Sequence, residues 1–189
     1  MSDTLDIKEV LSVLRKEGTV LYPTDTVWGI GCDATNAKAV DKIFRMKERV
    51  KDKSMIILAK DINMLKQYVT YLPDVAIELI GSVSDPLTVI YPGARNLPKN
   101  VIASDGSIAI RIPRHDFCQD LLDAFGKPIV STSANISGAS NPYSFTNVID
   151  TIKQSVDYVV SEKYQYLSNL KPSTIIKIDE KGEMFILRS

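Results

Sequence analysis

The stretch KPIVSTSANISG, Lys127–Gly138, passes from a short apolar run into a series of small hydrogen-bonding residues. Ile129 and Val130 follow a Gly-Lys-Pro break, which is typical of the start of a buried strand. The residues after them, Ser131–Gly138, include three serines, one threonine and one asparagine. Such residues favour turns, so a polar turn is one interpretation. The alternative is a cradle for a polar ligand, in which small side chains let backbone amides come close.

Short apolar strands and amphipathic helices alternate on both sides of this stretch. Strands are predicted at residues 19–22, 54–59, 87–91, 107–113, 128–132 and 157–160, with a closing hairpin of residues 173–178 and 183–188. Helices are predicted around residues 7–14, from residue 36, at 62–69, 75–80 and 117–125, and near 146–154. Residues 23–34 and 94–106 are predicted to be loops. This order indicates an α/β or α+β fold in a single domain, residues 1–189.

The composition is ordinary for a globular protein. The chain has 189 residues, of which 44% are hydrophobic and 24% charged, and its formal net charge is zero. No apolar run reaches about 18 residues, so we expect no membrane span, and the N-terminus does not resemble a signal peptide. Two isolated cysteines suit a reducing cytoplasm. With only one histidine and two cysteines that are distant in the sequence, a protein-built zinc site is not expected. Zero net charge argues against a protein that mainly grips duplex nucleic acid.

A basic run extends from Lys38 to Lys53. Its seven cations and three anions give a local charge of +4 (7 − 3) in a chain of zero net charge. A solvated helix face explains the first lysines. In KERVKDK, residues 47–53, cations recur at every second position, so an extended backbone would point several of them to one side. A phosphate-binding edge explains this part equally well, because Lys and Arg are the usual phosphate binders.

The usual signatures of nucleotide binding and covalent catalysis are missing from the sequence. There is no G-x-x-x-x-G-K-[ST], no G-x-G-x-x-G opening a helix and no G-x-S-x-G. We expect His115 to be a capping or surface residue, so a serine or cysteine nucleophile would have no visible base. The segment TDTVW, Thr24–Trp28, follows a predicted strand end. It is either a capped turn with its Trp packed on the core, or the hydroxyl rim and aromatic wall of a pocket.

The predicted strand SIAIRIP, Ser107–Pro113, has one polar face. Its three isoleucines share one side, and Ser107, Ala109 and Arg111 share the other. Two small residues beside an arginine leave room for a ligand, and the planar guanidinium matches a carboxylate with two parallel hydrogen bonds. The alternative is an arginine on a solvated face, or one paired with an acid such as Asp116.

Four segments occur in the order and at the spacing of the YrdC/Sua5 family, which the chain resembles nearly from end to end. They are YPTDTVWGIGCDA, KERVKDKSMIILA, SIAIRIPRH and IVSTSANISG. The length is that of the family's short bacterial form. The resemblance implies a single YrdC-like domain over residues 1–189, built as a twisted mixed sheet with flanking helices and a concave basic face.

The resemblance also implies the site residues. The family pattern K-x-R … S-x-N marks as catalytic and ATP-binding the residues Lys47, Arg49, Ser133 and Asn135. ATP is further expected to contact Lys53 and Ser107. The threonine pocket is expected at Thr24, Trp28, Arg111 and Ser131, with the arginine on the threonine carboxylate. We expect no metal ligand, and we expect the long cations of the K-x-R pair to lie outside the core.

The activity implied by the resemblance is that of an L-threonylcarbamoyladenylate synthase, which joins L-threonine, bicarbonate and ATP and releases pyrophosphate. This chemistry needs no protein nucleophile, in agreement with the missing signatures. Mg²⁺ is expected with the ATP, and partner proteins are expected to move the threonylcarbamoyl group to adenosine 37 of tRNA. Two alternatives stay open. One is a protein that binds double-stranded RNA or the ribosome, and the other is a carbamoyltransferase module of the hydrogenase-maturation type that forms a carbamoyl adenylate.

The sequence departs from the family pattern in several places. Val50 stands where a proline usually follows the K-x-R arginine, and VSDP, Val83–Pro86, stands in place of W-P-G-P. The loop QYLSNLKPST, residues 165–174, lacks the usual glycines. These differences concern the closure of the threonine pocket and leave the predicted nucleotide residues unchanged.

Overall fold

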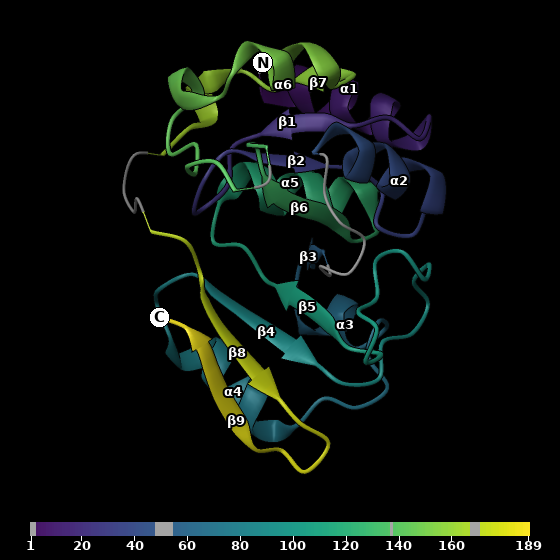
Figure 1. Cartoon of the computed structure of the whole chain (residues 1–189), viewed down its shortest axis with the longest axis vertical. Coiled ribbons are helices and arrows are strands. Elements are labelled where there is room, and N and C mark those ends of the chain that lie inside the picture. Colours follow the sequence, from purple (N-terminus) through teal and green to yellow (C-terminus); the bar gives the residue numbers. More distant parts are fainter. Residues whose placement is uncertain (1–2, 48–54, 137, 167–170) are drawn as a thin grey trace.

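A single mixed sheet forms the centre of the molecule. The computed structural model describes residues 3–47, 55–136, 138–166 and 171–189. Its strands are β1 (Val20–Tyr22), β2 (Gly29–Gly31), β3 (Ile56–Leu58), β4 (Leu87–Tyr91), β5 (Ile108–Arg111), β6 (Ile129–Ser133), β7 (Tyr158–Val159), β8 (Thr174–Ile178) and β9 (Met184–Arg188). Among the described residues the order across the sheet is β7-β1-β2-β6-β3-β5-β4-β8-β9 (Figure 1). The pairs β1/β7, β3/β5 and β4/β8 are parallel, and the other pairs are antiparallel.

Helices pack on both faces of this sheet. They are α1 (Asp3–Arg15), α2 (Ala37–Met46), α3 (Ile62–Leu65), α4 (Asp74–Ser82), α5 (Asp116–Phe125) and α6 (Asp150–Ser155), with short 3-10 turns at Phe145–Asn147 and Glu162–Tyr164. Apolar side chains of α1 and α5 share one core cluster with Tyr22 and Leu58. Helix α2 contributes Val40 and Ile43 to a larger cluster on the opposite face. None of the described helices is long and apolar enough to cross a membrane.

Strand β6, from the stretch quoted first, joins the two parts of the sheet. Its last residues pair with β2, where Ser133 lies opposite Gly29. Its first residues pair with β3 on the other side, where Val130 lies opposite Ile57. The apolar residues of the stretch and its first polar residues, Ser131–Ser133, therefore lie in a central strand, and the rest of the polar part follows the end of β6.

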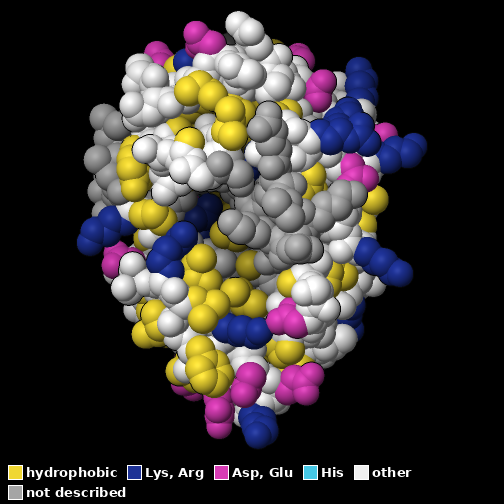
Figure 2. Space-filling model, viewed as in Figure 1, with side chains coloured by type: hydrophobic (Ala, Val, Ile, Leu, Met, Phe, Trp, Pro, Cys, Tyr) yellow, Lys and Arg dark blue, Asp and Glu magenta, His cyan; other side chains and the backbone are white. Residues whose placement is uncertain are grey.

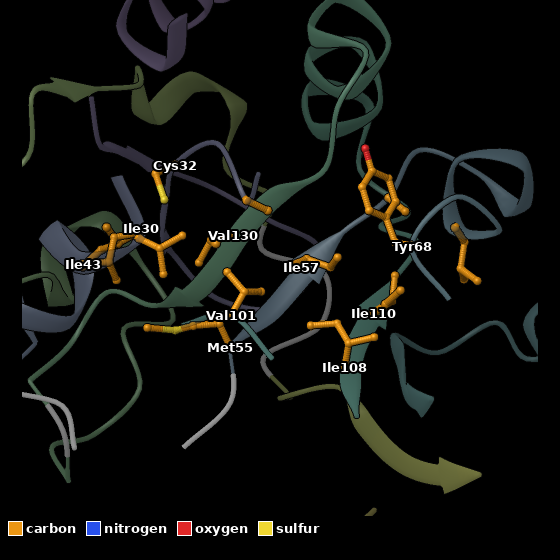
Figure 3. Packing of buried hydrophobic residues seen from close by; sticks show 14 of the residues in the cluster. Ile30, Cys32, Ile43, Met55, Ile57, Tyr68, Val101, Ile108, Ile110 and Val130 are labelled. Carbon is orange, nitrogen blue, oxygen red and sulfur yellow. The ribbon is translucent and has the colours of Figure 1, made fainter. Parts of the chain in front are cut away.

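Neighbouring residues of the central strands alternate between the two core clusters, as the period of a strand requires. Ile57, Ile110 and Val130 pack in the larger cluster on the α2 side (Figure 3). Leu58 and Ile129, one position away, pack in the cluster of α1 and α5. The predicted alternation of the strand at residues 107–113 is confirmed, because Arg111 lies on the face opposite to the isoleucines.

Helix α2 brings Lys47 of the basic run to the end of β6. The side chain of Asn36 caps the helix by accepting hydrogen bonds from the backbone N–H groups of Lys38 (2.9 Å) and Ala39 (3.1 Å). Lys47 is the residue directly after the helix, and its backbone still donates to Ile43 (3.0 Å). The cap at one end and the buried apolar face together fix where Lys47 leaves the helix.

Two element predictions are wrong, and backbone contacts give the reasons. Residues 23–34 were expected to form a loop, yet β2 lies within them. A Cβ on Gly31 would lie 2.6 Å from a ring carbon of Tyr22 and from the Val130 carbonyl oxygen. Because these distances are too short for a side chain, β2 fits between β1 and β6 only with glycine at this position. The helix expected near residues 146–154 is divided, because Val148 and Ile149 adopt extended backbone between the 3-10 turn and α6.

The helix expected at residues 62–69 is shorter, because α3 ends at Leu65 and Val69 instead bridges to Ala94. The closing hairpin is confirmed, with β8 and β9 antiparallel. The mixed sheet with flanking helices is confirmed as well. The concave basic face stays a prediction, since residues 48–54 lie outside the described ranges.

Candidate functional site

A cavity of about 290 Å³ opens on the face of the sheet that α1 and α5 cover elsewhere. On three neighbouring strands of this face, Ile56 pairs with Ala109 on one side and with Ser131 on the other. The small side chains of two of these residues leave space above the sheet. Polar lining groups come from Thr24, Arg111, Ser131, Ser133, Ser173 and Arg188. The face drawn in Figure 2 is hollowed near its middle, with Lys or Arg side chains at the edge of the hollow.

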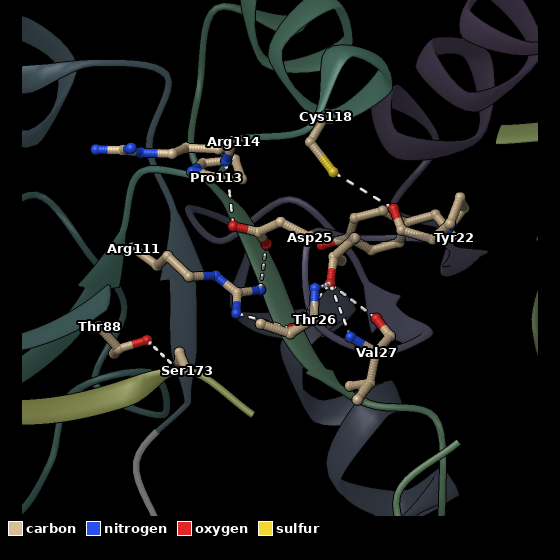
Figure 4. Close-up of polar contacts among 12 residues, drawn as sticks. Tyr22, Asp25, Thr26, Val27, Thr88, Arg111, Pro113, Arg114, Cys118 and Ser173 are labelled. Atoms are coloured by element: carbon tan, nitrogen blue, oxygen red, sulfur yellow. Dashed lines mark hydrogen bonds and ion pairs between the residues drawn. The ribbon is translucent and has the colours of Figure 1, made fainter. Parts of the chain in front are cut away.

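Arg111 reaches this central cavity from the end of β5. Its side chain is only 5% exposed, and Nη1 donates a hydrogen bond to Oγ1 of Thr26 (2.9 Å). Its Nη2 lies 3.5 Å from Oδ1 of Asp25 (Figure 4). The acid beside the arginine is therefore Asp25, not Asp116, which accepts a hydrogen bond from the Tyr166 hydroxyl.

Thr24 and Ser131, both predicted for the threonine pocket, line the cavity. Oγ1 of Thr24 accepts from the backbone N–H of Thr26 (3.1 Å) and donates to the carbonyl of Val27 (2.8 Å). The hydroxyl thus closes the turn between β1 and β2, and this turn fixes the side chains that surround Arg111. Ser131 is placed by β6, opposite Ile56 of β3.

Lys47, Ser133 and Asn135, which are far apart in the sequence, form one cluster. The Lys47 ammonium donates to the backbone carbonyls of Ser133 and Asn135 (2.7 Å for Asn135) and to the Asn135 side-chain oxygen (3.2 Å). Ser133 Oγ donates to the same side-chain oxygen (2.6 Å). Nδ2 of Asn135 donates to the carbonyl of Ala139 (2.6 Å). The cluster therefore shapes the loop after β6, and its Ser133 lines the cavity.

The expectation that Lys47 lies outside the core is wrong. Its side chain is 1% exposed, because the stem is packed under the loop and the ammonium is directed at carbonyl oxygens. The other predicted cations, Arg49 and Lys53, lie outside the described residues.

Neither Trp28 nor Ser107 is among the described residues that line the cavity, and Trp28 packs in the core cluster on the opposite face of the sheet. Trp28 is 1% exposed, and its ring packs at a tilt against that of Phe145, with centroids 4.9 Å apart. Its indole N–H donates a hydrogen bond to Oε1 of Gln165 (2.6 Å). Oγ of Ser107 donates to Asp105 (2.5 Å). Hydrogen bonds from Lys177 and from Ser107 lower the pKa of Asp105 to about 2.

His115 is buried, which corrects the expectation of a capping or surface residue. It precedes α5 at the cap position, but its side chain makes no capping hydrogen bond. Its ring is 2% exposed, with Nε2 3.0 Å from the Tyr164 carbonyl and the ring 4.7 Å from that of Tyr166. Burial lowers the pKa of His115, and the charges of Asp25 and Asp116 oppose this shift.

Among the polar residues that line the cavity, sequence reasoning gave no role to Asn141, Ser173 and Arg188. Nε and Nη2 of Arg188 donate to the Ser173 carbonyl (3.0 and 2.7 Å), and Oγ of Ser173 lies 2.8 Å from Oγ1 of Thr88. Burial and the charge of Arg111 lower the pKa of Arg188. The available signal was a single arginine at the end of the apolar run MFIL. Arg188 reaches the cavity only because β9 pairs with β8 and β8 pairs with β4.

In the described part of the chain, no three His, Cys, Asp or Glu side chains form a group that could hold a metal ion. Cys32 and Cys118 are both buried and unpaired. The polar groups of the cavity are therefore hydroxyls, an amide and two guanidinium groups, a set that suits an anionic, hydroxyl-bearing ligand.

Comparison with known proteins identifies the family of the chain. The family model described as Telomere recombination (Sua5/yciO/yrdC) matches residues 12–189. Over 188 residues the chain is 34% identical to the threonylcarbamoyl-AMP synthase of Pseudoalteromonas translucida (strain TAC 125), covering 98% of this chain and 99% of that protein. E. coli YciO has a similar structure, with a TM-score of 0.84 and 25% identity over 99% of this chain and 89% of its own.

The structure of P. abyssi Sua5 complexed with L-threonine is similar as well, with a TM-score of 0.88 and 27% identity over 96% of this chain. This chain spans only about half of that longer protein, 53% of its length. The family model covers almost the whole chain, and the P. translucida relative is similar along its entire length. The chain belongs to the Sua5/YciO/YrdC family.

Proposed function

We propose that this protein is an L-threonylcarbamoyladenylate synthase, which makes threonylcarbamoyl-AMP and pyrophosphate from L-threonine, bicarbonate and ATP. The relative that matches it from end to end carries that name. One structural observation supports the proposal most directly. Four of the residues predicted for the site, Thr24, Arg111, Ser131 and Ser133, line one cavity.

The reaction needs alignment and positive charge more than a protein nucleophile. The threonine amine takes up bicarbonate, with loss of water, to give a carbamate. A carbamate oxygen then attacks the α-phosphorus of ATP, the bond to the bridging oxygen breaks, and pyrophosphate leaves with the electron pair. A site that holds the two reactants side by side supplies most of what such a step requires.

In this proposal the threonine lies at the Arg111 end of the cavity. The guanidinium binds the amino-acid carboxylate, and it is preset for this by the Thr26 hydroxyl, 2.9 Å from Nη1. The hydroxyls of Thr24 and Ser131 are on the same wall and would contact the polar atoms of threonine. Trp28 would act indirectly, by packing in the core beneath the turn that carries Thr24.

ATP would occupy the end of the cavity next to the loop after β6. Ser133 and the backbone of that loop would bind phosphate or ribose oxygens, while Lys47 and Asn135 hold the loop in shape. We propose that Arg49, Lys53 and Ser107 complete the ATP site. Mg²⁺ would arrive on the triphosphate and be held by phosphate oxygens and water, because the described residues offer no cluster of ligands for it.

The product would be consumed by a threonylcarbamoyl-transferase complex that modifies adenosine 37 of tRNA, in the cytoplasm. The family membership of the chain supports this assignment. The chemistry of the product supports it as well, because a mixed anhydride is an activated donor whose acyl group a second enzyme can transfer.

The test is pyrophosphate release with ATP, L-threonine and bicarbonate omitted in turn. We expect release only when all three are present. Release without threonine would contradict the proposal. Release with carbamoyl phosphate in place of threonine and bicarbonate would favour the carbamoyltransferase alternative. Salt-dependent binding of double-stranded RNA without turnover would favour the RNA-binding alternative.

A further inference from the structure

Two guanidinium groups face one cavity. Arg111 lines it from β5 and Arg188 from β9. The charge of Arg111, after burial, lowers the pKa of Arg188, which means that the two cations repel one another across the space. The proposed reaction requires this space to accept a carboxylate with one negative charge and a triphosphate with several. The site must therefore direct the carboxylate to one arginine and the phosphates to the other.

The two groups differ in charge compensation. Arg111 is 5% exposed, and the carboxylate of Asp25, itself 6% exposed, lies 3.5 Å from its Nη2. Arg188 is exposed and is held by the neutral Ser173 carbonyl. In the described part of the chain, no carboxylate oxygen forms an ion pair with Arg188. Arg111 therefore has its charge balanced by a neighbouring carboxylate, and among the described residues Arg188 has no such partner.

Asp25 is itself fixed in place. Its Oδ2 accepts a hydrogen bond from the backbone N–H of Arg114 (3.1 Å), while its Oδ1 is buried, faces Arg111 and has no hydrogen-bond partner (Figure 4). The side chain of Arg114 donates to the carbonyls of Ile80 (3.2 Å) and Ser84 (3.4 Å) at the end of α4. The Asp25 carboxylate is therefore held by a backbone N–H group, and its position does not depend on the side chain of Arg111.

We propose that Asp25 is a positioning residue that reserves Arg111 for a singly charged carboxylate and keeps phosphate groups away from it. This inference rests on the proposed function. A carboxylate that replaces part of the Asp25 contact adds one negative charge to a balanced pair. A phosphate or pyrophosphate would place two or more charges beside the fixed Asp25 carboxylate, and like charges this close repel strongly where water is excluded. Phosphates are then directed to the uncompensated Arg188 side.

The experiment measures the affinity for L-threonine by calorimetry, with and without millimolar inorganic phosphate. The variant Asp25→Asn keeps the size of the side chain and removes its charge, and Asp25→Glu is the matched control that keeps the charge. For Asp25→Asn we expect phosphate to weaken threonine binding about tenfold or more, because phosphate now competes at Arg111. For the wild type and for Asp25→Glu we expect threonine affinity to change by less than about twofold, because the retained carboxylate repels phosphate from Arg111.

The inference would be overturned if phosphate changed the threonine affinity of Asp25→Asn and of the wild type to the same extent, whether that change is large or absent. A purely structural role of Asp25 would weaken threonine binding in both buffers alike and would also overturn it. If Asp25→Asn does not fold, the wild type decides: pyrophosphate should compete with ATP and not with threonine, and competition with threonine overturns the inference. A wild type that binds no threonine at all would instead contradict the proposed function.

Discussion

The buried ammonium group of Lys47 donates a hydrogen bond to the backbone carbonyl of Asn135, 2.7 Å away. This contact joins the basic run to the loop after β6, two features that the sequence shows in separate places. Because the ammonium is directed at carbonyl oxygens, its positive charge is set at the end of β6 beside Ser133. Lys47 therefore shapes the loop and supplies charge at the same point.

Replacing Lys47 with Met should damage both stability and turnover. Met retains the buried apolar stem but leaves the carbonyls of the loop without their donor, which costs about 1–3 kcal/mol. Loss of a fixed charge near the phosphates should lower turnover by roughly 10²–10³-fold. Urea unfolding and pyrophosphate release measure the two effects. Lys38→Met, on the exposed side of α2, is the control and should change neither. Normal turnover in Lys47→Met would remove Lys47 from the site.

Asn135→Ala should weaken ATP binding more than threonine binding. Its amide donates to the carbonyls of Ala139 (2.6 Å) and Ser140 (3.2 Å), so the alanine variant loses the contacts that close the loop. We expect the KM for ATP to rise by about tenfold, the scale of one or two lost hydrogen bonds. Asn63→Ala, at an exposed position of α3, is the control. A larger effect on the KM for threonine would place the loop at the other substrate.

The fold could be predicted where side chains follow a regular period. The strand at residues 107–113 was predicted with Arg111 on the correct face, because alternating isoleucines define a buried side. Strand β2 could not be predicted, since glycines carry no period and their role depends on contacts with Tyr22 and Val130. The divided helix around Val148 could not be predicted either, because local backbone preference overrode an apolar spacing.

The site was predictable only in part, for a similar reason. Small residues and cations at Ser133 and Lys47 are visible as local patterns, and the family resemblance connected them. The pairing of Arg111 with Asp25 depends on how β5 lies beside the turn after β1, which no local pattern contains. Arg188 depends on a strand order that only the folded sheet defines.

Neither cysteine should react with thiol reagents in the folded protein. Burial raises the pKa of Cys118 well above its usual range, and the charge of Asp25 raises it further. Burial also raises the pKa of Cys32. Because the thiolate is the reactive form, we expect no modification by a chromogenic disulfide at pH near 8 and modification of both thiols in denaturant. Rapid reaction of one thiol before unfolding would show that its surroundings open.

The protein should lose stability in mildly acidic solution through His115. Burial holds the folded-state pKa of this histidine below its unfolded value of about 6.5, so the unfolded chain binds the proton more readily. The contribution is complete above the unfolded pKa, and it is lost as the pH falls through that value toward the folded pKa.

The measurement is urea unfolding of the wild type and His115→Gln between pH 8 and pH 5. We expect the free energy of unfolding to fall more steeply with acid in the wild type, whose only histidine is His115. Parallel pH profiles for the two proteins would mean that the histidine is not responsible.

Arg111→Lys should raise the KM for threonine by about tenfold or more, because a charge-assisted contact contributes about 1.5–3 kcal/mol and a lysine cannot form two parallel hydrogen bonds to a carboxylate. The geometry sharpens the expectation. Nη1 is already directed by Thr26 and Nη2 by Asp25, so a lysine ammonium would lose at least one of these contacts. The KM for ATP should change much less. Steady-state kinetics with each substrate varied separately measure both constants.

Arg188→Lys is the matched comparison, since the second arginine lines the same cavity but has no acid beside it among the described residues. We expect the opposite ranking, with the KM for ATP raised more than the KM for threonine, because an uncompensated cation attracts the more highly charged substrate. Two variants with opposite rankings would separate a carboxylate end from a phosphate end within one cavity. If Arg111→Lys shifts the constant for ATP and leaves that for threonine unchanged, the two ends are assigned in the wrong order.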